Sequence, residues 1–79
     1  TQVLVALLAH PNFSLRQAAL FDLAESGWVA GAPLLATADV ALNLRINALK
    51  RLFDVALQLG RVPLAQVAAA ILPQLDKLF

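Results

Sequence analysis

Two arginines stand 29 residues apart in similar stretches of this sequence, and their guanidinium groups are the first candidates for chemistry. Arg16 is followed by Ala19, Leu20 and Leu23, and residues three, four and seven places apart share one face of a helix. The same residue types follow Arg45 at the same spacing. Each guanidinium group therefore projects from an apolar helix face and needs an acceptor for its donors.

An acidic residue is available to only one of these arginines. Asp39 precedes Arg45 by six residues, in an expected loop, and its carboxylate can accept a bidentate pair from Arg45 or from the neighbouring repeat. His10 holds the same place before Arg16 and cannot supply a carboxylate. We interpret both arginines as parts of a structural ladder. The alternative is that Arg16 or Arg45 binds a carboxylate or propionate group of a ligand.

Trp28 is the only tryptophan and the third candidate binding residue. It follows Gly27 in an expected turn between a long helix and a short one. In that position the indole either packs beneath the next helix or anchors a partner, since tryptophan is enriched among the residues that dominate interfaces. We take Trp28, Arg16 and Arg45 as the candidate binding residues.

The remaining reactive side chains indicate no catalytic site. His10 is the only histidine and there is no cysteine, so a metal site lacks suitably spaced ligands. Asp22 and Glu25 lie one helical turn apart, but at the polar edge of their helix, where we expect solvation rather than acid–base work. No hydroxyl stands in a nucleophile motif. We expect no catalytic residue, no metal and no cofactor, and no catalysis by the chain alone.

These residues would be positioned by helices. Asn12 or Ser14 is suited to cap the helix that carries Arg16, and Gly27 and Gly60 are suited to end the two long helices. Pro63 opens the last helix, and we expect Pro73 to break or kink it. No segment alternates at period two, which argues against strands. The expected helices cover 2–9, about 15–26, 33–38, about 42–59, and 63–72 with a kinked extension over 74–79.

The chain repeats itself at a spacing of 29 residues. Leu15 to Leu23 aligns with Leu44 to Leu52, and the match extends to Glu25 against Asp54. A period of this size is typical of stacked helix pairs. We expect an all-α fold, an α-solenoid of about five helices, forming one domain over 1–79. Its repeats would cover about 1–27 and 29–60, with a partial third unit over 61–79, and the chain would be part of a longer protein.

The repeats resemble a known family. The stretch LLAHPNFSLRQAALFDL, residues 7–23, looks like a HEAT repeat, with its leucine pair, turn proline, arginine and Ala-Leu stripe. The second copy departs from the pattern by having Val40 and Ala41 in place of the turn proline. Its stretch LNLRINALKRL, residues 42–52, is similar to the phycobilisome lyase HEAT-like group. That resemblance implies binding of phycobiliproteins, or a bilin lyase or isomerase subunit that helps to attach or remove a linear tetrapyrrole.

The composition of the chain indicates which classes of partner are expected. Hydrophobic residues make up 61% of the chain and charged residues 14%, so there is more apolar surface than 79 residues easily bury. A net charge of +1 gives no footprint for nucleic acid, and Gly and Pro interrupt every long uncharged stretch, which argues against a membrane span. We expect a protein partner, a scaffold or adaptor role, self-association through apolar ends, and a cytoplasmic location.

Overall fold

The computed structural model describes residues 2–79 and consists of helices, without a strand in that range. This confirms the all-α prediction. The element absent from the prediction is a 3₁₀ turn, η1, which leads directly into α3. In chain order the elements are α1 (Gln2–Leu7), α2 (Phe13–Glu25), η1 (Val29–Gly31), α3 (Ala32–Thr37), α4 (Leu42–Leu59) and α5 (Leu64–Leu78).

Side-chain and backbone caps fix the bounds of α2. The side-chain oxygen of Asn12 accepts hydrogen bonds from the backbone N–H groups of Ser14 at 2.8 Å and Leu15 at 3.4 Å, two donors that a helix start leaves without partners. Beyond the C-terminal end, Gly27 adopts φ 73°. This left-handed conformation suits glycine and turns the chain sharply towards Trp28.

The last helix bears on the expectation that Pro73 breaks or kinks it. Pro73 lies inside α5, and the helix continues through it to Leu78, so it does not break there. Proline removes the hydrogen bond to the carbonyl four residues earlier, at Ala69, and its ring crowds that carbonyl. Both Pro73 and Ala69 are exposed, so water can satisfy that carbonyl. The expected end of α4 is confirmed, since Gly60 follows Leu59 with φ 64°.

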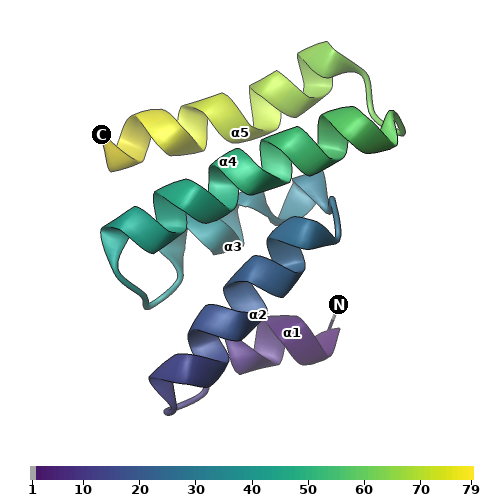
Figure 1. The fold of residues 1–79 in the computed structure, drawn as a ribbon. Coiled ribbons are helices and arrows are strands. Elements are labelled where there is room, and N and C mark those ends of the chain that lie inside the picture. The colour runs from purple at the N-terminus through teal and green to yellow at the C-terminus, as the bar shows by residue number, and fades with distance from the viewer. Residues whose placement is uncertain (1) are drawn as a thin grey trace.

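The helices form two layers (Figure 1), in which α1 and α3 lie behind α2 and α4, and α5 runs alongside α4. Each long helix packs against the short helix before it, α2 against α1 and α4 against α3. Helices two places apart in the chain also pack together, α2 with α4 and α3 with α5. The turns that follow the two long helices lie near each other as a result.

The core lies between the layers, with α4 at its centre. Leu49 and Leu52 of α4 are completely buried, as are Leu20 of α2 and Ile71 of α5. Burying one such side chain contributes about 1.5–3 kcal/mol. In contrast, α1 has no buried residue. The N-terminal helix is therefore the most weakly held element.

Candidate functional site

A groove lies between the turn that follows α2 and the turn that follows α4. Its volume is about 510 Å³, within the usual range for ligand sites. No acidic residue lines it. The lining residues are Ser26, Gly27, Trp28, Val29, Ala30, Ala56, Leu59, Arg61, Val62, Gln66 and Ala70.

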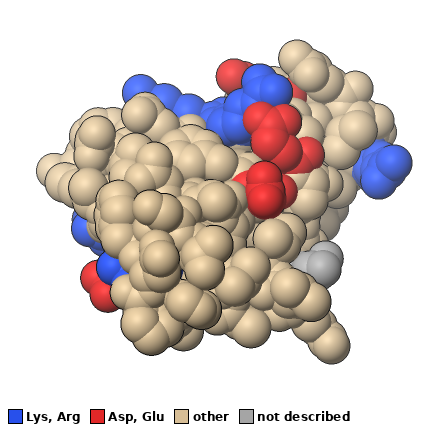
Figure 2. All heavy atoms as spheres, turned by 60° about the horizontal axis from the view of Figure 1, so that its bottom comes forward, with Lys and Arg blue, Asp and Glu red and all other residues tan. Residues whose placement is uncertain are grey.

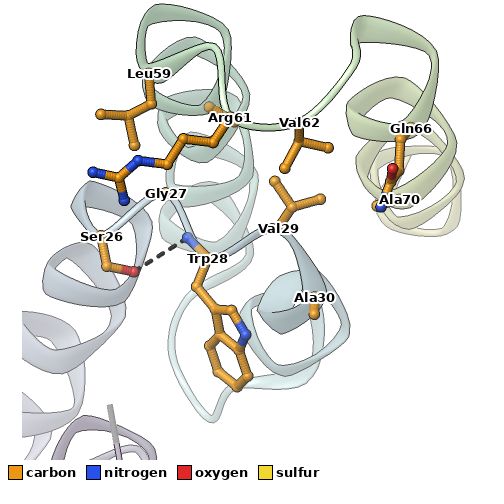
Figure 3. Close-up of a pocket in the computed structure, with 11 residues that line it drawn as sticks. Ser26, Gly27, Trp28, Val29, Ala30, Leu59, Arg61, Val62, Gln66 and Ala70 are labelled. Carbon is orange, nitrogen blue, oxygen red and sulfur yellow. Dashed lines mark hydrogen bonds between the residues drawn. The ribbon is translucent and has the colours of Figure 1, made fainter.

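Figure 3 shows how these side chains are arranged. Arg61 reaches back over Ser26 and Gly27, and the indole of Trp28 points away from it. Val29 and Val62 point towards each other on the side of the groove nearer to Gln66 and Ala70. The Trp28 backbone N–H donates to the hydroxyl of Ser26 at 3.3 Å, which helps to fix the turn. An extended segment lying in the groove would meet apolar surface along its length and a cation at one end.

The indole of Trp28 rests on a glycine. A Cβ added to Gly31 would lie 2.5 Å from Cε3 of the indole, so the ring covers this backbone position closely. Gly31 itself is buried. Trp28 nevertheless keeps 37% of its surface exposed, and its indole N–H donates to no group within residues 2–79. The ring is therefore held in place on one side and open on the other.

The cationic end of the groove is formed by Arg61, in the turn between α4 and α5. Arg61 is exposed, and within residues 2–79 it forms neither a hydrogen bond nor an ion pair. Gln66 of α5 lines the other side of the groove (Figure 3) and is also exposed. Both side chains are available to a ligand with oxygen acceptors, and a guanidinium group binds a carboxylate in bidentate fashion.

Arg16, the second candidate, lies outside this groove and joins two loops. Its Nη1 donates to the carbonyl oxygens of His10 at 2.8 Å and Pro11 at 2.9 Å, and its Nε donates to the carbonyl oxygen of Asp39 at 2.9 Å. Its guanidinium carbon also lies 5.8 Å from the centre of the Phe13 ring. Main-chain oxygens, rather than a carboxylate, thus hold Arg16 between the α1–α2 and α3–α4 connections.

Arg45, the third candidate, does not form the expected pair with the Asp39 carboxylate. No such ion pair exists within the part of the chain that is described. Arg45 Nη1 donates to the carbonyl oxygen of Ala36 at 3.2 Å, while its buried Nε has no partner. The loop after α3 turns its backbone, not the Asp39 side chain, towards the arginines, so the carboxylate stays in solvent.

Glu25 and Arg51 form the one ion pair that links helices in residues 2–79. Both Nε and Nη2 of Arg51 donate to the Glu25 carboxylate, the latter at 3.1 Å. This hydrogen bonding lowers the pKa of Glu25 and raises the pKa of Arg51. The pair is half exposed, so it sets the register of α2 against α4 more than it stabilises them.

Charges are unevenly distributed over the surface. The face in Figure 2 carries most of its acidic and basic side chains in a band along the upper edge, above a broad uncharged area. Neither α1 nor α3 contains a charged residue. No helix in the structure combines the length and hydropathy that a membrane span needs. Residues 2–79 contain no group of three or more His, Asp or Glu side chains that would hold a metal ion.

Comparisons with known protein families, with curated proteins and with solved structures find no match. The site rests on its geometry alone. Of the three candidate residues, the structure places only Trp28 in the groove, and it adds Arg61, Val62 and Gln66, which the sequence reasoning missed. A signal for two of them existed, because Arg61 and Val62 follow the helix-ending Gly60 as Trp28 and Val29 follow the helix-ending Gly27.

Proposed function

We propose that this chain is a protein-binding module of HEAT-like helix pairs, a scaffold or adaptor that holds a partner segment in the Trp28 groove. The repeat part of the proposal is supported by the packing of α2 with α4 and of α3 with α5. Stacked helix pairs produce this alternation, because each pair covers the next. We also propose a cytoplasmic location, as expected from the sequence. This part of the proposal does not depend on the groove.

One observation carries the binding part, namely the exposed indole of Trp28 held against Gly31. An aromatic side chain that is already fixed loses little conformational freedom when a partner covers it. Tryptophan is also the residue type most enriched among those that dominate binding energies. The adjacent groove is apolar, ends at Arg61 and contains no acid.

This lining defines the partner chemistry. A large apolar side chain fits against Trp28, Val29 and Val62, and a carboxylate a few residues away fits Arg61. The proposed ligand is therefore an extended peptide segment with an Asp or Glu close to a large apolar residue.

A selection experiment tests the proposal. Random 12-residue peptides displayed on phage would be selected on the full chain, and the enriched sequences synthesised with a fluorescein label for anisotropy titrations. We expect enriched peptides to combine a large apolar residue with Asp or Glu. Arg61→Gln should weaken their binding, whereas Lys77→Gln should not, since it removes the same charge from the far end of α5.

Two results would refute the proposal. One is a failure of the selection or of its mapping, in which either no peptide is enriched or the enriched peptides bind Trp28→Ala and Arg61→Gln as tightly as they bind the unaltered chain. The other concerns the lyase resemblance: a change in the visible absorbance of added biliverdin that is lost in Trp28→Ala would make a tetrapyrrole, not a peptide, the ligand of the groove.

A further inference from the structure

One side of α4 carries residues that correspond, in the 29-residue repeat, to the residues with which α2 contacts α4. Glu25 of α2 pairs with Arg51 of α4. Asp54 stands 29 residues after Glu25, at the same place in the repeat. Asp54 is exposed and forms no ion pair within residues 2–79. Asp54 is thus placed like the acidic partner of a helix-to-helix pair, and the basic groups beside it, Arg51 and Lys50, belong to α4 itself.

Apolar side chains surround Asp54 as they would at a helix interface. A shallow groove of about 270 Å³ lies between α4 and α5 and is lined by Lys50, Phe53, Asp54, Leu72 and Leu75. Leu72 keeps 49% of its surface exposed, and Leu57, one turn beyond Asp54, keeps 42%. This groove is distinct from the Trp28 groove and shares no lining residue with it.

Helix periodicity shows that the two sides correspond. Leu57 follows Phe53 by four residues and Asp54 by three, so it shares a face of α4 with both. The counterparts of Phe53 and Asp54 in the 29-residue repeat are Ala24, which is buried, and Glu25, which pairs with α4. The face of α2 that α4 covers thus corresponds to a face of α4 on which Phe53 is only partly buried and Asp54 and Leu57 are exposed.

We propose that the groove between α4 and α5 docks an amphipathic helix of a partner protein. Its apolar stripe covers Phe53, Leu72 and Leu75, and an arginine or lysine of that helix pairs with Asp54. A second copy of this chain, stacked in the same register, would bring Asp22 opposite Asp54, because Asp22 occupies the place of Arg51 one repeat earlier. Like charges at that position disfavour the second copy and favour a different polypeptide.

The chain itself supplies a probe. A synthetic peptide of residues 42–59, acetylated, amidated and fluorescein-labelled, carries Arg51 on the side that α4 turns to α2. We expect it to bind the full 79-residue chain saturably in an anisotropy titration. The same peptide with Arg51→Glu should bind more weakly, and the Asp54→Lys protein should restore its binding.

Variants of the protein locate the contact. We expect Asp54→Lys to weaken binding of the unaltered peptide by about threefold or more. Leu72→Lys should weaken it by about tenfold, because it removes buried apolar area. Leu64→Lys is the matched control, since Leu64 is 60% exposed on the same helix and lies outside the groove. Circular dichroism would check that each variant keeps its helices.

Three outcomes would overturn the proposal. The first is the absence of saturable binding, and the second is an equal effect of Leu72→Lys and Leu64→Lys. The third is a concentration-dependent dimer in sedimentation that Leu72→Lys abolishes, which would assign the groove to a second copy. Trp28→Ala should leave peptide binding unchanged, so failure at the Trp28 groove does not count against this groove.

Discussion

The six-membered ring of Trp28 lies over Gly31, and the contact leaves no room for a side chain there. A Cβ on Gly31 would stand 2.5 Å from Cε3 and 2.9 Å from Cζ3 of the indole. The backbone of Gly31 has φ −82°, which any residue can adopt. The ring, rather than the backbone conformation, therefore requires glycine at this position.

Gly31→Ala should displace the Trp28 indole from its position against the backbone of residue 31. We expect the fluorescence emission of Trp28, the only tryptophan, to move to longer wavelength as the ring becomes more exposed. Stability should fall by about 1–3 kcal/mol, the usual cost of adding volume to a packed site. Emission spectra and urea unfolding would measure both effects.

Gly60→Ala is the matched control for that substitution. Gly60 has φ 64° and nothing within 4 Å of an added Cβ, so alanine meets backbone strain without a collision. We expect a loss of about 1 kcal/mol and an unchanged emission maximum. If Gly60→Ala shifted the emission as much as Gly31→Ala, the contact between the ring and Gly31 would not be what holds Trp28.

Arg16 should contribute more to stability than Arg45, although the sequence treats them as equivalent. Arg16→Ala removes three hydrogen bonds that join two loops, and we expect a cost of about 2–3 kcal/mol. Arg16→Lys should restore little of the lost stability, because a single ammonium group cannot donate to both loops as the separate guanidinium nitrogens do. Denaturant midpoints of these variants would test the ranking.

Arg45→Met provides the contrast. Its guanidinium makes a single hydrogen bond, and its buried Nε has no acceptor. Replacing it with an apolar side chain of similar length should cost less than about 1 kcal/mol, or stabilise the fold, because an unsatisfied buried donor is removed. If Arg45→Met lost more unfolding free energy than Arg16→Ala, the contacts described for Arg45 would be contradicted. An ion pair between Arg45 and Asp39 would then be favoured again.

The Glu25–Arg51 pair should make stability depend on pH in the acid range. Because the pKa of Glu25 is lowered from its ordinary 4.5, its contribution is fully present above that value and is lost as the pH falls through the lowered pKa. Arg51→Gln should remove this part of the dependence. Thermal melts between pH 2 and pH 7 would compare the two proteins, and parallel curves would mean that the pair does not act on folding.

Periodicity and end signals in the sequence were enough to predict most of the helices. Residues 42–59 were expected as a helix and form α4, because Gly60 ends it and the apolar spacing is regular. The sequence predicts a break or a kink at Pro73, and α5 does not break there. A proline costs a helix less where water can reach the freed carbonyl, and the exposure of Ala69 is a property of the packing.

The candidate site was less accessible from sequence. Trp28 was found because its type and its turn are local signals. Arg61 and Gln66 lie more than thirty residues further along the chain and reach the groove only through the packing of α2 with α4. The acceptors of Arg16 escaped prediction because they are main-chain oxygens, which every residue possesses. Whether Trp28, Arg16 or Arg45 binds a partner stays a prediction.

The most direct test of the Trp28 groove as a binding site is the affinity of a selected, fluorescein-labelled peptide for the wild-type chain and for Trp28→Ala. We predict that the substitution weakens binding by about 1–4 kcal/mol and reduces the free energy of unfolding by less than that. The contrary result is a large loss of stability with unchanged affinity in the protein that remains folded. That pattern would make Trp28 a packing residue and leave the partner-binding surface elsewhere.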